Sequence, residues 1–306
     1  MSQISIILPT YNVEKYIARA LESCINQTFK DIEIIVVDDC GNDKSIDIAK
    51  EYASKDNRIK IIHNEENLKL LRARYEGVKV ATSPYIMFLD PDDYLEFNAC
   101  EECINILDEN TDMLCFNAYM INNTKNPIKS YFNNAYTIDE FFLFLIDKNN
   151  FIWNAWGKLF KKNNLINTFL SLNLKNNKIT MAEDALIFAV YTKNIKKIQT
   201  FNKCLYNYNC ENNNSTTNQK CITQIKDYIK DLKCCSRKLS NYNDNSCHSL
   251  FCQYIISCLQ IHKYDLCYKY IYKNIFIKIL IKLSRKRQKI KQKSLLKTIK
   301  YNEFKF

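Results

Sequence analysis

Three aspartates directly follow a short apolar run in the first third of the chain. The stretch "YIMFLDPDDYLE" begins at Tyr85 and places Asp90, Asp92 and Asp93 after five apolar or aromatic residues. Carboxylates crowded at the end of a buried strand repel one another and lose hydration. A divalent cation would offset that cost, because Mg²⁺ and Mn²⁺ take carboxylate oxygens and keep positions for phosphate oxygens and water. We therefore predict metal and ligand binding for Asp90 and Asp92, whereas Asp93 fits the N-cap of a helix over 96–108.

Two other predicted strands also end in polar residues. The run "IEIIVVDD" ends in Asp39, and the run "ISIILP" is followed by Thr10 and Tyr11. In a parallel sheet the carboxyl ends of the strands share one edge, and ligands bind there. We therefore expect Thr10, Tyr11 and Asp39 to lie close to the Asp90 cluster.

The elements that must position these residues are apolar runs separated by amphipathic segments. Runs that begin at residues 4, 32, 59, 85 and 112 read as strands, and the first four lack strict alternation, as expected for strands covered on both faces. Helical segments over 13–27, 44–55 and 68–81 lie between them. This order predicts an α/β fold with right-handed crossovers and a mostly parallel, Rossmann-like sheet flanked by helices.

The remaining sequence changes character twice. Residues 121–200 are mixed and less periodic, and from residue 201 the chain becomes rich in Asn, Lys, Tyr and Cys, which predicts helices joined by polar loops. We therefore divide the chain into three regions, 1–120, 121–200 and 201–306.

The net charge of +11 is concentrated at the end of the chain. Residues 268–306 contain 13 Lys or Arg and one acid, Glu303, so the rest of the chain is close to neutral. The spacing of the basic residues gives one charged helical face, with Ile271, Ile275, Ile279 and Leu283 on another. Such a helix suits an anionic membrane surface. A solvated helix and a nucleic-acid-binding tail are the alternatives, and the neutral body gives the latter no support.

The sequence also bears on location. It has no apolar stretch of about 18 residues, so no conventional membrane-spanning helix is expected. The first residues, "MSQISIILPTYN", lack the basic region and cleavage site of a signal peptide. We expect a cytoplasmic protein.

Four motifs together resemble one known family. "ISIILPTYNVEKYIARALESCINQTF", "IEIIVVDDCGND", "LRARYEG" and "YIMFLDPDD" occur in this order, followed by "WGKLF", "MAED" and "LYNYNCENNNS". They resemble the family 2 glycosyltransferases, which implies a GT-A fold, a nucleotide-sugar donor, a DXD motif and inversion at the anomeric carbon. Within the family the chain is most similar to bacterial lipooligosaccharide β-1,3-galactosyltransferases. That similarity implies transfer from UDP-galactose to a terminal N-acetylgalactosamine of the outer core, with Mn²⁺ or Mg²⁺ as cofactor.

The resemblance implies a donor role for six residues. Thr10 and Tyr11 would line the uracil site, with the Tyr11 ring stacked on the base, and Asp39 would accept a hydrogen bond from the uracil N–H. Arg74 would contact the diphosphate, Asp90 would hold the ribose directly or through the metal, and Asp92 would be the principal metal ligand.

Each of three donor residues also has a purely structural interpretation. Tyr11 would then pack against a helix, Asp39 would cap the helix after Gly41, and Arg74 would form a surface ion pair. The sequence leaves these alternatives open.

The resemblance places the catalytic base in the pair Glu183-Asp184. Asp184 would remove the proton of the acceptor hydroxyl as its oxygen attacks the anomeric carbon. Thr180-x-x-Glu183 also fits a helix capping box before "ALIFAV". The two interpretations are compatible, with Glu183 structural and the helix dipole keeping Asp184 ionised.

Several residues match the acceptor side of the family. Trp153, Trp156 and Lys158 would lie beside the acceptor, although either Trp also suits a buried core. Tyr208 and Asn213–Ser215 would close over the donor. Lys69 stands where these enzymes usually have glycine, which puts full activity in question.

These motifs give the three regions their expected roles. Residues 1–120 would bind the nucleotide sugar, 121–200 would bind the acceptor and carry the base, and 201–306 would form a helical region with a membrane-associating tail. The expected enzyme is a metal-dependent hexosyltransferase bound peripherally to the cytoplasmic face of the inner membrane, with a lipid-linked oligosaccharide acceptor. The alternatives are transfer of another hexose or N-acetylhexosamine in capsule or other glycan synthesis, and a non-catalytic sugar-nucleotide or membrane-binding module.

Overall fold

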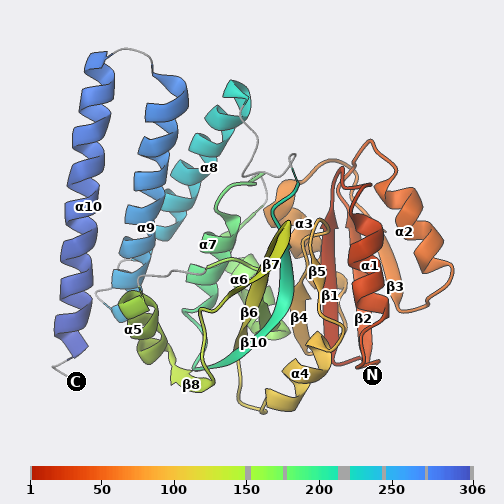
Figure 1. Cartoon of the computed structure of the whole chain (residues 1–306). Coiled ribbons are helices and arrows are strands. Elements are labelled where there is room, and N and C mark those ends of the chain that lie inside the picture. Colours follow the sequence, from red (N-terminus) through yellow and green to blue (C-terminus); the bar gives the residue numbers. More distant parts are fainter. Residues whose placement is uncertain are drawn as a thin grey trace. The chain divides into compact units, whose positions relative to one another are not determined.

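The computed structural model describes residues 2–148, 153–174, 178–212, 221–242, 246–272 and 275–303. It divides into two compact units, each built from separate stretches of the chain (Figure 1). The first unit contains residues 1–138, 154–178 and 194–213, and the second contains 139–153, 179–193 and 214–306.

The first unit begins with the parallel strand–helix repeat that the sequence predicts. Its strands are β1 (Ile4–Thr10), β2 (Ile32–Asp38), β3 (Ile59–His63) and β4 (Tyr85–Phe88). They alternate with the helices α1 (Ile17–Ile25), α2 (Ser45–Ala53) and α3 (Lys69–Val80). All seven residues of β1 are buried, because helices cover both faces of this part of the sheet. The predicted α/β class is confirmed.

The second half of the sheet mixes strand directions. Its strands are β5 (Tyr94–Leu95), β6 (Met113–Asn122), β7 (Thr124–Ile128), β8 (Asn134–Thr137), β9 (Lys158–Lys161) and β10 (Lys197–Asn209). The sheet order is β3-β2-β1-β4-β9-β6-β10-β5, with β7 beside β6 and β8 beside β10. β9 is antiparallel to both β4 and β6, whereas β10 is parallel to β6. The sheet is therefore mixed, and the prediction of helix from residue 201 is wrong over 201–209, where β10 continues.

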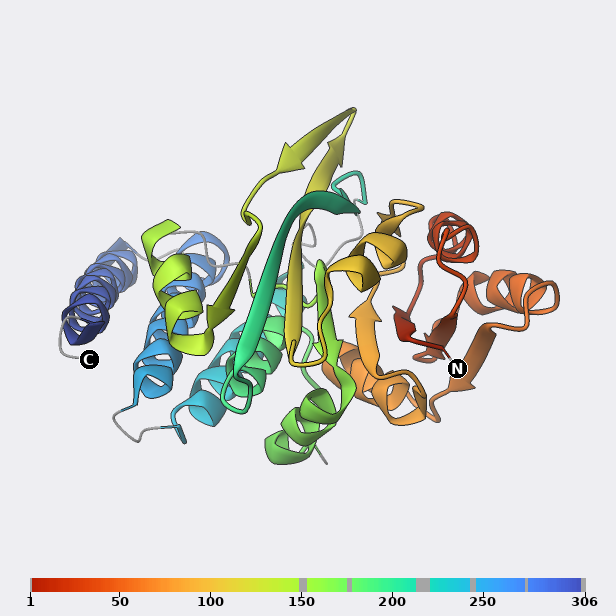
Figure 2. The same cartoon turned by 90° about the horizontal axis from the view of Figure 1, so that it is seen from below.

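Helices cover the sheet on both faces. Figure 2 shows α1 and α4 (Ala99–Ile106) on one face, and α3 and α6 (Lys162–Leu172) on the other. The core under α1, α2 and α4 uses alternate residues of β1, namely Ile4, Ile6 and Leu8. The opposite face packs closely against α3, because a Cβ at Gly77 would collide with the side chain of Ile7. Gly77 therefore lets α3 approach β1 more closely than any other residue would.

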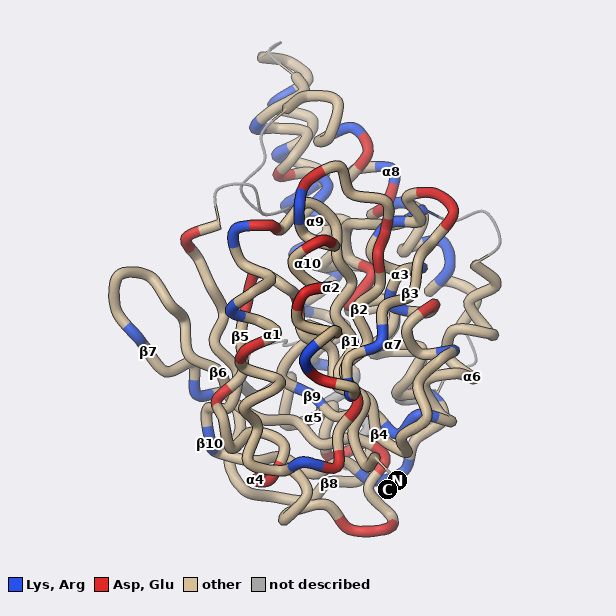
Figure 3. Tube along the Cα trace, turned by 90° about the vertical axis from the view of Figure 1, so that its right-hand side faces the viewer, with Lys and Arg blue, Asp and Glu red and all other residues tan. Residues whose placement is uncertain are grey.

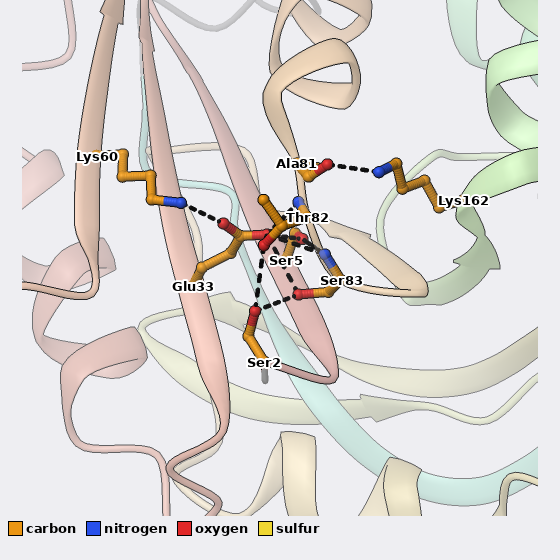
Figure 4. A network of polar contacts seen from close by, with 8 residues as sticks. All are labelled: Ser2, Ser5, Glu33, Lys60, Ala81, Thr82, Ser83 and Lys162. Carbon is orange, nitrogen blue, oxygen red and sulfur yellow. Dashed lines mark hydrogen bonds and ion pairs between the residues drawn. The ribbon is translucent and has the colours of Figure 1, made fainter.

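A buried carboxylate joins the strands at the end of the sheet where β1 and β2 begin (Figure 4). Glu33 accepts hydrogen bonds from the Ser5 hydroxyl at 2.6 Å and from the backbone N–H groups of Thr82 and Ser83, and its other oxygen pairs with Lys60 at 2.9 Å. Burial by itself would raise the pKa of Glu33, but these donors outweigh it and lower the pKa to about 2. The network fixes the loop between α3 and β4.

The second unit is helical. It contains most of α5 (Ile138–Lys148), α7 (Glu183–Tyr191), α8 (Ile222–Leu239), α9 (Cys247–Leu266), a π-helical turn (Cys267–Ile271) and α10 (Ile275–Glu303). Its core is aromatic: the ring of Phe251 stacks on Phe142 at 4.0 Å and meets Phe188 edge-on at 6.0 Å. Among the described residues, no helix is both long and apolar enough to cross a membrane.

Candidate active site

The carboxyl ends of β1, β2 and β4 meet at one edge of the first unit. β1 lies between the other two strands, and Thr10 is in register with Asp38. The Asp39 N–H donates to the Thr10 carbonyl oxygen at 3.0 Å, and the Leu89 N–H donates to the Ile7 carbonyl oxygen at 3.0 Å. The predicted grouping of Thr10, Asp39 and the Asp90 cluster at one sheet edge therefore follows directly from the strand register.

Asp39 anchors the start of α3. Its carboxylate accepts hydrogen bonds from the N–H groups of Leu68 at 2.7 Å and Lys69 at 3.0 Å, and from the Asn64 amide at 2.8 Å. Burial raises the pKa of Asp39 in spite of these three donors. The alternative that Asp39 caps the helix after Gly41 is wrong, because Asp43 accepts the Ser45 N–H at the start of that helix.

Lys69 has an unusual backbone conformation at the same place. Its φ of +66° lies in the left-handed region, where a side chain is disfavoured and glycine is at ease. Its ammonium lies 5.8 Å from the ring centre of Tyr11, whose side chain is 46% exposed. The interpretation that Tyr11 is packed away against a helix does not fit this exposure. Thr10 is buried, and its hydroxyl donates to the Leu8 carbonyl oxygen at 3.0 Å.

Arg74 connects α3 to the acidic strand end. Its side chain is 2% exposed, and its guanidinium lies 5.5 Å from the Phe88 ring centre and forms an ion pair with Asp90 Oδ1 at 2.8 Å. The surface ion pair considered for Arg74 is therefore wrong, because the arginine is buried. Asp90 is joined by Arg74 to the helix that Asp39 anchors, so these three residues form one connected group.

Three side chains that the sequence did not single out hold Asp92. The Asn212 amide donates to Asp92 Oδ2 at 2.8 Å. The Asp92 carbonyl oxygen accepts from the Arg19 guanidinium at 2.9 Å and from the Asn209 amide at 3.1 Å. Burial and then the charge of Asp90 raise the pKa of Asp92. The motif "LYNYNCENNN" was a signal for the two asparagines, whereas nothing distinguished Arg19 from other helical arginines.

Asp93 connects the acidic loop to β10 and does not start a helix. Its carboxylate accepts a hydrogen bond from the Tyr206 hydroxyl at 2.6 Å and from the Asn209 N–H at 2.7 Å, and the Asp90 N–H donates to the same hydroxyl at 3.3 Å. The N-cap prediction for Asp93 is wrong, since α4 begins only at Ala99. Burial, followed by the charges of Asp92 and Asp90, raises the pKa of Asp93 well above its ordinary value.

The residues at this edge supply some, but not all, of the ligands that a divalent cation needs. Within the described ranges, no group of three or more His, Cys, Asp or Glu side chains could enclose a metal. The two carboxylates of Asp90 and Asp92 nevertheless lie close enough for their charges to interact. In the described part of the chain, Asp90 Oδ2 has no hydrogen-bond or ion-pair partner. Mg²⁺ and Mn²⁺ are commonly held by one or two carboxylates together with substrate phosphates. The donor set therefore suits a cation that a diphosphate helps to bind.

An aromatic stack lies beside the acidic loop. The Trp156 ring is half-buried and stacks on Tyr206 at 5.0 Å and on Tyr208 at 5.5 Å. Lys158 is fully buried in β9, and its ammonium donates to the Asn154 carbonyl oxygen at 2.7 Å. Trp156 thereby packs on the tyrosine whose hydroxyl donates to Asp93, whereas the Lys158 ammonium bonds the segment that precedes its own strand. Asn213–Ser215, expected to close over the donor, lie outside the described residues.

The predicted base belongs to the second unit. α7 begins at Glu183, which is 5% exposed, and the preceding Ala182 has a φ of +63° without a side-chain cap. The capping box from Thr180 is therefore wrong. Asp184 is half-buried in the first turn of α7, and its carboxylate accepts the Ala185 N–H at 2.7 Å. Trp153, also in this unit, is half-buried.

α8 holds the turn that precedes the predicted base. Asp231 Oδ2 accepts hydrogen bonds from the N–H groups of Thr180 and Met181, each at 3.0 Å. One helical turn further on, the Cys235 thiol lies 3.6 Å from the Ala182 carbonyl oxygen. The turn is thus shaped by residues about 50 positions away, and no local sequence pattern pointed to them.

Comparisons with known proteins agree with this architecture. The chain is 43% identical over 114 residues to the putative glycosyltransferase EpsH of Bacillus subtilis, an alignment that covers 37% of this chain and 33% of EpsH. It is 33% identical over 221 residues to EpsJ, an uncharacterized glycosyltransferase of the same organism, covering 70% of this chain and 62% of EpsJ. The chain thus spans less than two thirds of the length of either relative.

A solved structure shares the fold. TarS 1–349 from S. aureus, crystallised with UDP-GlcNAc, has a TM-score of 0.66 and 19% identity, and the superposition covers 99% of this chain and 92% of TarS. The family model "Glycosyl transferase family 2" matches residues 5–171, which contain strands β2 to β9, almost all of β1 and the acidic loop. The chain therefore belongs to glycosyl transferase family 2.

Proposed function

We propose that the protein transfers galactose from UDP-galactose to a terminal N-acetylgalactosamine of a lipooligosaccharide outer core, forming a β-1,3 linkage by a single inverting displacement. The motifs quoted from the sequence support the choice of sugar and acceptor. The general activity, glycosyl transfer from a nucleotide sugar, rests on membership of the family.

The observation that carries the proposal is the acidic loop at the end of β4. Asp90 and Asp92 stand side by side at the carboxyl edge of the parallel strands, where α/β proteins bind ligands. Their mutual repulsion is costly for the fold. A cation bound between these carboxylates and the donor diphosphate would offset the repulsion, because it attracts both groups.

Each donor residue has a distinct task in this proposal. The exposed Tyr11 ring stacks on uracil, and Asp39 accepts the uracil N–H with the acceptor capacity that its three internal donors leave. Arg74 adds positive charge near the diphosphate, and Asp92 and Asp90 hold Mn²⁺ or Mg²⁺. When bound, the cation stabilises negative charge on the departing diphosphate.

Asp184 is the proposed catalytic base. Its place in the first turn of α7 favours the ionised carboxylate, because the positive end of the helix dipole lies there. The ionised form accepts the proton of the acceptor hydroxyl as that oxygen attacks the anomeric carbon from the side opposite the diphosphate. Glu183, Trp153, Trp156, Lys158 and Tyr208 act as supporting or acceptor-side residues.

The proposed regions follow from these tasks. Residues 1–120 bind the donor, 121–200 bind the acceptor and carry the base, and 201–306 contain, beyond β10, a helical region whose basic tail associates with an anionic membrane. The protein would act on a lipid-linked acceptor at the cytoplasmic face of the inner membrane. The long basic α10 supports this location.

A second candidate function is transfer of another hexose or N-acetylhexosamine in capsule or other glycan synthesis. It is favoured by the structural similarity to TarS, which was crystallised with UDP-GlcNAc. The two candidates share every proposed catalytic step and differ in the residues that recognise the sugar hydroxyls and the acceptor.

The experiment incubates the protein with UDP-galactose, Mn²⁺ and a soluble terminal N-acetylgalactosaminide, and detects product by mass spectrometry. UDP-glucose and UDP-GlcNAc are tested as competing donors, with and without EDTA. The proposal expects galactosylated product that EDTA, Asp92→Ala and Asp184→Asn each abolish.

The other outcomes separate the alternatives. Product from another donor supports the second candidate. Metal-dependent UDP binding without turnover of any donor supports a non-catalytic module, and absence of both UDP binding and product contradicts the proposed function as a whole.

A further inference from the structure

The second unit exposes an unusual concentration of large apolar side chains where α9 gives way to α10. We call this the hairpin tip and define it as residues 267–272 and 275–283. Seven large apolar side chains in it are 37–76% exposed: Tyr272, Ile275, Phe276, Ile277, Ile279, Leu280 and Leu283. None of the five residues of the π-helical turn is buried either. Apolar surface gathered in this way marks an interaction site.

The rest of α10 is different, because it packs on α9. Leu295 is buried, the Ser257 hydroxyl donates to the Gln288 carbonyl oxygen, and Arg285 pairs with Asp265. Beyond Leu283, among the α10 side chains that the structure describes, only Ile290 is a strongly exposed large apolar residue. The sequence predicted an amphipathic helix lying flat on a surface. The exposed fractions of the α10 side chains show instead that most of the exposed apolar surface lies at one end of the helix.

The hairpin tip also contains basic and aromatic residues. The Tyr268 ring lies 5.0 Å from the Lys278 ammonium and 5.2 Å from that of Lys282, and the Tyr270 ring lies 5.1 Å from that of Lys269. No acid occurs between Asp265 and Glu303. Lys and Arg are instead mixed with Asp and Glu throughout the first unit (Figure 3). Half-buried tyrosines with lysine ammonium groups over their rings suit the boundary between lipid headgroups and acyl chains.

We propose that the hairpin tip inserts its apolar side chains into an anionic lipid bilayer, with α10 projecting from the surface rather than lying along it. This inference deepens the proposed function and rests on its membrane-bound acceptor. Two other occupants fit less well. A second copy of the chain in a symmetric contact would bring two identical patches together, each carrying the positive charges of Lys278 and Lys282. A nucleic acid would match the charge but leave seven apolar side chains facing phosphates.

Vesicle sedimentation tests the insertion. Wild-type protein should bind phosphatidylcholine vesicles that contain phosphatidylglycerol, and bind vesicles of phosphatidylcholine alone more weakly. The variant Ile275→Ser/Leu280→Ser should lose about tenfold or more in affinity for the anionic vesicles. Its matched control is Ile222→Ser/Leu170→Ser, since Ile222 also begins a helix and Leu170 is as exposed as Leu280, at 60% and 61%. The control should bind as wild type does.

Depth measurements separate insertion at the tip from a helix lying flat. Leu280→Trp and Ile290→Trp are compared for fluorescence quenching by brominated lipid, above the signal of the two native tryptophans. Insertion at the tip predicts quenching at position 280 and little at 290. Equal quenching at both positions, or equal loss of binding in the matched control, overturns the proposal. So does a dimer in solution that only Ile275→Ser/Leu280→Ser dissociates.

Failure of this inference and failure of the proposed function are distinguishable. Transfer to the soluble N-acetylgalactosaminide should be unchanged in Ile275→Ser/Leu280→Ser, because the site residues lie elsewhere in the sequence. Vesicle binding without any sugar transfer would contradict the proposed function and leave the hairpin tip as a membrane anchor. Sugar transfer without vesicle binding would contradict insertion of the hairpin tip and leave the proposed transferase activity in place.

Discussion

The side-chain amide of Asn212 donates a hydrogen bond to Asp92 Oδ2 at 2.8 Å. This bond joins the end of β10 to the acidic loop after β4. It fixes one carboxylate oxygen of Asp92 and therefore the direction in which the other oxygen points. Asn212 is accordingly expected to position the proposed metal ligand without touching the donor.

Asn212→Ala should weaken metal-dependent UDP binding. A hydrogen bond to a charged group contributes about 1.5–3 kcal/mol, so we expect roughly a tenfold rise in the Mn²⁺ concentration that half-saturates the UDP complex. Calorimetric titration of Mn²⁺ in the presence of UDP measures this directly. Asn126→Ala, at an exposed position on β7, is the control. Identical Mn²⁺ titrations for the two variants would rule out the positioning role.

Lys69→Gly should stabilise the protein. The left-handed φ of Lys69 costs about 1 kcal/mol for a residue with a Cβ, and glycine avoids that cost. Lys69→Ala removes the ammonium near Tyr11 equally but keeps the Cβ. The free energy of unfolding in urea should therefore rise by about 1 kcal/mol in the glycine variant relative to the alanine variant. No difference between them would show that the strain is relieved in another way.

Asp231→Ala should reduce turnover without changing donor affinity. It removes the acceptor of the Thr180 and Met181 N–H groups and so loosens the turn before Asp184. We expect kcat to fall about tenfold, since small displacements of a reacting group are costly, while the KM for the donor stays unchanged. Asp227→Ala, on an exposed part of the same helix, should behave as wild type. A fall in thermal stability with unaltered kcat would mean that Asp231 serves only the fold.

Glu33→Gln should destabilise the protein in a pH-dependent way. The pKa of Glu33 is lowered from 4.5 to about 2, so its contribution to stability is complete above the ordinary pKa and disappears as the pH falls toward 2. The free energy of unfolding should differ from wild type by about 2 kcal/mol at neutral pH, and the difference should shrink in acid. Urea unfolding at several pH values tests this. A constant difference would show that shape rather than charge is what Glu33 contributes.

The first four strands were predictable because each is a predominantly apolar run without strict alternation, which is typical of strands buried on both faces. Each begins at the residue where its apolar run begins, for example β3 at Ile59. β10 was missed because its sequence, "KIQTFNKCLYNYN", mixes Lys and Asn with apolar residues. Asn207 and Asn209 are buried there, and their amides donate to Glu96 and to the Asp92 backbone. A polar residue whose partner lies more than 100 positions away has no local signature of burial.

Long-range partners also explain the errors at helix starts. The capping box at Thr180 was plausible locally, but the N–H group of Thr180 is taken by Asp231 from α8. Asp93 was a reasonable N-cap by position, yet Tyr206 and the Asn209 backbone bind its carboxylate. Sequence motifs identified the charged residues at the site. They could not identify which of these carboxylates are already bound by hydrogen bonds from other parts of the chain, as Asp93 is.

The construction of the first unit from three separate stretches has a consequence for the order in which the protein matures. Asp92 is synthesised 117 residues before Asn209 and 120 residues before Asn212. At roughly 5–20 residues per second, the ribosome leaves the acidic loop without these partners for roughly 6–24 s. The strands β1 to β4 can pair during that interval, but the loop gains its final hydrogen bonds only after β10 has emerged and inserted beside β6. Completion of this edge of the sheet therefore waits until about two thirds of the chain has been made, although its aspartates belong to the first third.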